Sequence, residues 1–167
     1  MSVHAEKTPM TSGTTFEPAT VNVRIKISAL WTAMLFVFIY VDHFSLLRPD
    51  VRADIEAGQI GGFTINQTFL LFTTAYVAIP ALMVFGTLVL RPAISRIANI
   101  SLSVLYAVTI VGASIGEGNY YYLLGSVLEV ALLAAVAYYA WTWPRIASST
   151  STNRPEASTE HLQHTTA

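Results

Sequence analysis

Four long runs of apolar residues dominate the pattern of the chain. They cover about residues 27–47, 67–90, 92–115 and 120–143. A helix of ~20 residues rises ~30 Å, which is the thickness of the hydrocarbon core of a bilayer. Strands of a membrane barrel would instead alternate apolar and polar residues over ~10 positions, and these runs do not alternate. The pattern predicts an all-α fold, an integral membrane four-helix bundle.

Local signals mark the ends of these runs. Pro92 suits the first turn of a helix, where its missing N–H costs nothing. Gly116 and Gly118 bracket a short turn, so the last two helices should form an antiparallel hairpin. Thr64 or Asn66 could cap the second helix. The one sizeable loop predicts a short helix over residues 49–58, which acts either as a lid over the bundle or as a plain connector.

The polar ends of the chain differ in composition from its middle. Residues 1–22 and 146–167 are rich in Ser, Thr and Pro. Such segments bury too little apolar surface to offset the entropy of ordering, so we expect disordered tails. The transmembrane domain should therefore span residues 23–145.

The placement of basic residues predicts the orientation in the membrane. Five fall on one side of a chain that crosses four times: Arg24, Lys26, Arg91, Arg96 and Arg145. The other side has Arg48 and Arg52, which acidic residues accompany. Cytoplasmic loops carry the excess of Lys and Arg. We therefore expect a multi-pass protein of the inner (plasma) membrane with both termini in the cytoplasm.

Composition supports the membrane prediction and excludes several functions. Hydrophobic residues make up 53% of the 167 residues and charged residues 11%, whereas soluble domains carry about 25% charged residues. The net charge of −1 argues against a nucleic-acid partner. The chain has no Cys and no phosphate-loop, nucleophile-elbow or paired-His motif. We therefore predict no catalytic residue, no metal site and no cofactor.

Glu129 is the most informative residue in the sequence. It lies nine residues from Tyr120 and fourteen from Trp143, well inside the last apolar run. A charge at such a depth costs about 3 kcal/mol on insertion scales. The side chain must therefore face protein or a wet cavity. Tyr122 and Ser126 lie on the same helical face, at i−7 and i−3.

Asp42 is a second acid at a similar depth. It lies six residues before Arg48, or ~9 Å inward at helical rise. If the first and last helices are neighbours, Asp42 and Glu129 meet in one internal polar cluster. Hydroxyls would come from Tyr122 and Ser126 and from Tyr76 or Tyr106. Two adjacent carboxyl groups could not both ionise cheaply, so one should hold a proton.

Each of these residues also has a plainer interpretation. Glu129 could be a structural acid bonded to a neighbouring helix, and Asp42 a solvated helix end. Pro80 frees the carbonyl of Tyr76 and should kink the second helix. Gly112 and Gly116 form a G-x-x-x-G pattern for close helix contact.

Several short segments carry a resemblance to a known family. They are Lys26-Ile-Ser-Ala-Leu-Trp31, Tyr40-Val-Asp42, Phe44-Ser-Leu46, Ile79-Pro80, Arg96-Ile-Ala-Asn99, Tyr121-Tyr122, Glu129 and Tyr139-Ala-Trp141. Over roughly residues 25–143 the chain resembles small bacterial four-helix membrane proteins known only as a domain of unknown function. The resemblance implies a four-helix membrane fold with Asp42 and Glu129 at motif positions, and no assigned activity. A looser similarity to DoxX-like proteins suggests a quinone- or redox-linked partner.

No substrate or reaction can be read from these residues. We expect an accessory or binding protein that acts through intramembrane contacts and has no catalytic activity in isolation. Its partners would be membrane lipids and either a second copy or a larger membrane complex. One alternative is a small proton-coupled transporter that uses Asp42 and Glu129. Another is an enzyme or partner of a quinone-like, lipid-soluble molecule.

Overall fold

The computed structural model describes residues 21–143, and it is all-α apart from one small hairpin. Its elements are α1 (Val23–Ser45), α2 (Pro49–Glu56), β1 (Gln59–Ile60), β2 (Phe63–Thr64), α3 (Gln67–Val89), α4 (Pro92–Ser114) and α5 (Tyr120–Trp141). Helices α1, α3, α4 and α5 are long and apolar enough to cross a membrane. The predicted four-helix bundle is therefore confirmed. Arg145 and the tails, apart from residues 21–22, lie outside the described residues.

The helix ends follow local signals rather than the limits of the apolar runs. Helix α1 begins at Val23, four residues before the apolar run, because the side chain of Asn22 accepts a hydrogen bond from the Arg24 N–H at 2.9 Å. Asn66 caps α3 in the same way, through the N–H of Phe69 at 2.8 Å. Helix α4 begins at Pro92. Backbone hydrogen bonding thus extends α1 past the charged residues that bound its apolar run.

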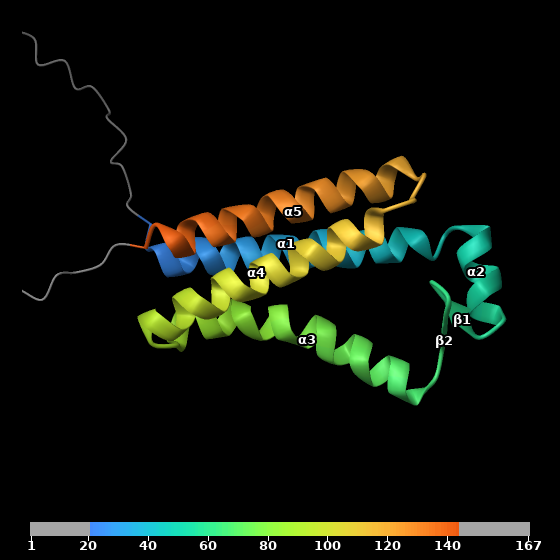
Figure 1. The fold of residues 1–167 in the computed structure, drawn as a ribbon, viewed down its shortest axis with the longest axis horizontal. Coiled ribbons are helices and arrows are strands. Elements are labelled where there is room, and N and C mark those ends of the chain that lie inside the picture. The colour runs from blue at the N-terminus through green and yellow to red at the C-terminus, as the bar shows by residue number, and fades with distance from the viewer. Residues whose placement is uncertain (1–20, 144–167) are drawn as a thin grey trace, which may run out of the picture.

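Helix α1 lies at the centre of the arrangement. It packs against α5 on one side and α3 on the other, and α4 packs mainly on α5. Figure 1 shows the start of α1 and the end of α5 at one end of the bundle, which we call the terminal end. The opposite end carries the connector, defined as residues 46–66, and the α4–α5 turn.

The connector contains a hairpin that the sequence analysis did not predict. Strands β1 and β2 pair antiparallel, Gln59 with Thr64 and Ile60 with Phe63. Gly61 and Gly62 form the turn, with φ of 54° and 83°. Two-residue hairpin turns favour such positive angles, which only glycine adopts without strain. The short helix expected over residues 49–58 is present as α2, and Gly58 follows it with φ of 74°.

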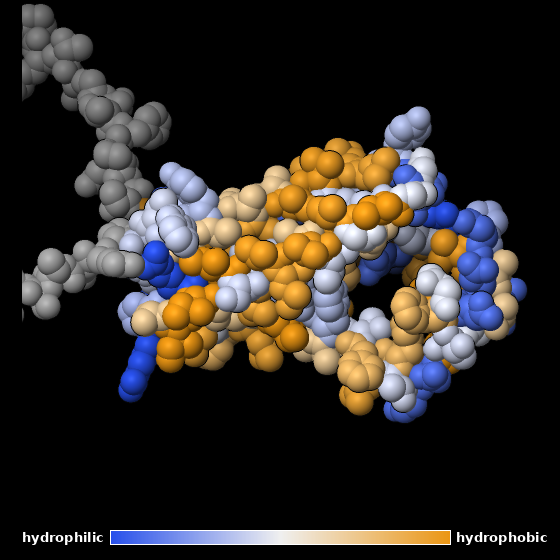
Figure 2. All heavy atoms as spheres, in the orientation of Figure 1, coloured by the Kyte–Doolittle hydropathy of each residue, from blue (hydrophilic) through white to orange (hydrophobic). Residues whose placement is uncertain are grey.

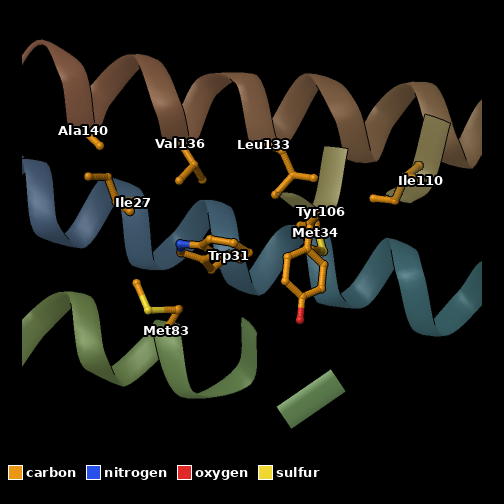
Figure 3. Packing of buried hydrophobic residues seen from close by; sticks show 9 residues of the cluster. All are labelled: Ile27, Trp31, Met34, Met83, Tyr106, Ile110, Leu133, Val136 and Ala140. Atoms are coloured by element: carbon orange, nitrogen blue, oxygen red, sulfur yellow. The ribbon is translucent and has the colours of Figure 1, made fainter. Parts of the chain in front are cut away.

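The core is densest toward the terminal end. Figure 3 shows Trp31 of α1 at its centre, with side chains from the other three long helices around it. The Trp31 indole N–H donates to Oδ1 of Asn99 at 2.6 Å, and Thr87 donates to the same oxygen at 3.2 Å. The Asn99 amide donates to the carbonyl of Ser95 at 2.7 Å. One buried amide therefore connects α1, α3 and α4.

Helix α3 bends at its internal proline. Pro80 has no N–H, so the Tyr76 carbonyl has no donor within the helix. The Tyr106 hydroxyl of α4 donates to that carbonyl at 2.5 Å, and Figure 3 shows its ring directed at α3. Beyond the bend, the N-terminal half of α3 runs away from α4 (Figure 1). The kink thus separates α3 from the bundle at the connector end.

The glycine contact between helices lies elsewhere than the G-x-x-x-G pattern predicts. A Cβ at Gly112 would meet nothing within 4 Å, and Gly116 is a turn residue with φ of 85°. That prediction is wrong for contacts within this chain, because Gly112 lies on an exposed face of α4. Gly125 instead brings α5 against α1, where a Cβ would lie 2.2 Å from Cγ2 of Val41.

The surface is apolar around the long helices and hydrophilic at both ends (Figure 2). At the terminal end, basic groups lie over aromatic rings at 5.5–5.6 Å: Arg24 over Trp143, Lys26 over Tyr139 and Arg96 over Trp141. Cation–π pairs of this kind suit a membrane interface, where the rings contact lipid and the charges reach water.

Candidate intramembrane cavity

Glu129 occupies a buried position on α5. Its side chain is 4% exposed, and Oε1 has no hydrogen-bond partner among residues 21–143. A buried polar atom without a partner is rare and costly, because it has lost water and gained nothing in exchange. The carboxyl group lines a cavity of about 430 Å³. Glu129 is therefore a group to which a ligand or water could supply the missing hydrogen bond.

Asp42 lies on α1 and lines the same cavity. It is three residues from the end of α1, and its own residue surface is exposed. Helices α1 and α5 are neighbours, as the expected meeting of the two acids requires. They approach each other closely at Gly125 and Val41. Asp42 also lines a second cavity of about 440 Å³, which includes His43 and shares Phe38 with the first.

Most of the predicted hydroxyl groups share this cavity. Tyr122, Ser126 and Tyr76 line it together with the two acids. Tyr106 does not, because its hydroxyl is directed to the Tyr76 carbonyl. Its role is to support the wall, since its ring lies against that of Tyr76 with centroids 4.6 Å apart.

Aromatic and small residues that the sequence analysis did not single out complete the walls. They are Phe38 and Val41 of α1, Phe63 of β2, Phe69 of α3, and Thr109, Ile110 and Ala113 of α4. Thr109 bonds the Tyr76 hydroxyl at 2.7 Å. Thr109 could have been identified from the sequence, because its hydroxyl follows Tyr106 by about one helical turn. Phe63 and Phe69 stack with centroids 6.1 Å apart, and nothing local in the sequence indicates that pairing.

The cavity continues into a larger one of about 1040 Å³. The two share Phe63, Phe69, Tyr76 and Thr109. The larger cavity lies between the connector and the N-terminal half of α3, and Figure 2 shows the molecule hollowed there. Its lining is mainly aromatic and Thr side chains. The bend at Pro80 thus opens a route from the apolar surface of the bundle to the two acids.

One ionic contact links the connector to the α4–α5 turn, and a second lies within the connector. Arg48 pairs with Asp50 at 2.5 Å and with Glu117 of the α4–α5 turn at 3.6 Å. Hydrogen bonds from Asn119 and the nearby Arg48 charge lower the pKa of Glu117, and Arg48 lowers that of Asp50. Ser45 and Tyr121 add a hydrogen bond of 2.9 Å between α1 and α5. The connector also contributes Phe63 to the cavity wall.

A metal site has no support in the part of the chain that the structure describes, since no three His, Asp or Glu side chains gather there. The cavity instead offers carboxyl oxygens, hydroxyls and aromatic faces. Such a lining can hydrogen-bond one polar group and enclose an apolar body.

Comparison with known proteins identifies the family of the chain. A family model described as a family of unknown function, DUF6326, matches residues 16–150. The chain belongs to this family. The resemblance noted in the sequence is thereby confirmed, and the match extends beyond residues 25–143 at both ends. The looser similarity to DoxX-like proteins stays a prediction. No curated protein and no solved structure matches the chain.

Proposed function

We propose that this protein is a membrane-embedded binding protein, which holds a lipid-soluble, amphiphilic molecule between α1, α3, α4 and α5. The observation that carries the proposal is the buried, unpartnered carboxyl oxygen of Glu129 at the end of an aromatic-walled cavity. The polar group of the ligand would bind Glu129 and Asp42. Its apolar part would extend past Tyr76 into the larger cavity.

The volume and position of the cavity support this function. Sites for small molecules have volumes of about 300–1,000 Å³ and few polar groups in a mostly apolar lining. The cavity at the acids, about 430 Å³, falls in this range. The adjoining hollow lies among helices whose outer faces are apolar, so a ligand would enter from the bilayer.

We place the protein in the inner membrane of a bacterium with both termini in the cytoplasm. The basic and aromatic residues of the terminal end support this orientation, since cytoplasmic faces carry the excess of Lys and Arg. The cavity would then lie in the outer half of the bilayer. Reporter fusions test the orientation. A reporter after Ala167 should be active in the cytoplasm, and one inserted near Ala57 should be active in the periplasm.

The binding function is tested by what the full chain retains from its native membrane. The mass of the purified protein would be measured by native mass spectrometry after removal of detergent in the gas phase. Any bound molecule would be identified after extraction. Ala113→Trp should abolish the bound mass, because position 113 lines the cavity. Ala134→Trp is the matched control, since position 134 lies in an apolar groove between α4 and α5. Equal retention by both variants, or no bound molecule in the unaltered protein, would contradict the proposal.

A small proton-coupled carrier is the second candidate. The observation that favours it is that two carboxyl groups face one cavity, where a proton and a ligand could compete for them. Four helices seldom enclose a path through the membrane, so a carrier would act as a homodimer. Proteoliposomes loaded with a pH-sensitive dye, together with ligand from the retention experiment, test it. Ligand-driven proton movement that Glu129→Gln abolishes would support a carrier, and its absence would leave binding as the function.

A further inference from the structure

We infer that the ligand is an organic cation with an apolar, aromatic-sized body, such as a lipophilic amine or an onium compound. This inference rests on the proposed function and adds the charge of the ligand. It follows from the groups that line the cavity and from those that do not.

The charges of the side chains that line the cavity are not balanced. Asp42 and Glu129 both line the cavity, and its described lining includes no Lys, Arg or His. His43 lines a neighbouring cavity, which shares Phe38 and Asp42 with this one. Arg48 of the connector already pairs with Asp50 and Glu117. Buried charges are paired in proteins, so an ionised Glu129 carboxyl group lacks a positive charge, which a ligand could bring in place of a proton.

Glu129 also offers a hydrogen-bond acceptor that no described residue uses. Glu129 Oε1 is buried and receives no hydrogen bond from residues 21–143. An ammonium group would donate a hydrogen bond to this oxygen, and any cation would be attracted to its negative charge. A ligand anion would face two acids with no compensating group. The unpartnered oxygen therefore favours a ligand with a hydrogen-bond donor, and the absence of a basic side chain in the lining favours a donor that carries positive charge.

The aromatic lining of the cavity also favours a cation, and it indicates an organic rather than an inorganic ion. Phe38, Tyr76 and Tyr122 line the cavity with the stacked pair Phe63 and Phe69. Ring faces attract cations, more strongly where water is excluded. Metal cations prefer six or more oxygen ligands at short range, whereas most of this lining is carbon and the space of about 430 Å³ exceeds that of an ion.

Two probes of nearly equal size and opposite charge separate charge from shape. Tetraphenylphosphonium and tetraphenylborate would be titrated, by equilibrium dialysis, against the full chain in nanodiscs of phosphatidylcholine, with binding to empty nanodiscs subtracted. We expect saturable binding of the phosphonium cation only. Glu129→Gln should weaken it at least tenfold, and Glu129→Asp, which keeps the carboxyl group, should weaken it less. Asp54→Asn is the control, because Asp54 is an exposed acid of α2 outside the cavity.

Several results would overturn the inference. They are equal binding of both probes, phosphonium binding that Glu129→Gln leaves unchanged, or an equal loss in Asp54→Asn. If Glu129→Gln fails to fold, Asp42→Asn takes its place with the same expected loss. Retention of a native molecule that Ala113→Trp abolishes, without phosphonium binding, would refute the cation and leave the binding function intact. Absence of both would refute both.

Discussion

Replacing Gly125 by alanine should loosen the contact between α1 and α5 beside the cavity. The new Cβ would lie 2.2 Å from Cγ2 of Val41, whereas ordinary contacts begin near 3.4 Å. The two atoms must therefore separate by more than an ångström. Valine in a helix has one strongly preferred rotamer, so the side chain cannot turn away freely. The backbones of the two helices have to move apart instead.

The magnitude follows from two opposing effects. Overpacking of this kind costs about 1–3 kcal/mol, and replacing glycine by alanine inside a helix contributes about 1 kcal/mol in the opposite direction. Gly112→Ala separates them, because a Cβ there meets nothing within 4 Å. Gly112→Ala should be neutral or stabilising. The difference between the two variants should therefore equal the steric cost, about 1–3 kcal/mol.

The assay is reversible unfolding of the full chain by SDS in mixed micelles. Val41→Ala removes the clashing methyl group, so the double variant of Gly125→Ala and Val41→Ala should recover most of the lost stability. Contacting residues of this kind show coupling energies of about 0.5–3 kcal/mol. If Gly125→Ala is as stable as Gly112→Ala, or if Val41→Ala brings no recovery, the close approach of α1 and α5 is refuted.

Three further predictions concern the polar contacts of the bundle. Asn99→Leu should lower the free energy of unfolding by about 1–3 kcal/mol, because it leaves the buried indole N–H of Trp31 without an acceptor. Unchanged stability in the same SDS assay would contradict this. Tyr106→Phe should cost about 0.6 kcal/mol, the mean for hydrogen bonds in membranes, by leaving the Tyr76 carbonyl unpaired, and no loss would mean that water replaces the hydroxyl. The pKa of Glu117 is lowered in the folded protein, first by hydrogen bonds from Asn119 and then by the Arg48 charge. These contacts therefore stabilise the fold above pH 4.5, and their contribution is lost as the pH falls through the folded value. Glu117→Gln should therefore reduce the pH dependence of the free energy of unfolding below pH 4.5. An unchanged pH profile would show that the contacts of the Glu117 carboxylate contribute nothing to stability.

Much of the secondary structure could be read from the chain because its causes are local. The long apolar runs require helices, since every backbone polar group in a bilayer must be satisfied within its own segment. Pro92 and Asn66 begin helices where a proline or a capping side chain satisfies the first turn. The free carbonyl of Tyr76 also follows from sequence alone, because it depends only on a proline four residues later.

Glu129 could be singled out for a similar reason. A carboxyl group fourteen residues from one end of a span and nine from the other has to be buried or wet, whatever surrounds it. Its helical neighbours Tyr122 and Ser126 follow from the period of the helix, and they line the same cavity. The depth of Asp42 could be estimated in the same way. The helix that Asp42 faces could not be predicted from the sequence.

The tertiary structure alone decided which residues meet across helices. Gly125 and Gly112 look alike in the sequence, yet one contacts α1 and the other faces outward. Tyr106 was a candidate for the cavity and instead pairs with the carbonyl that Pro80 frees. Phe63 reaches the cavity only through the hairpin of the connector. Helix formation depends on neighbours along the chain, but helix packing depends on the rotation and spacing of all four helices together, and no single segment carries that information.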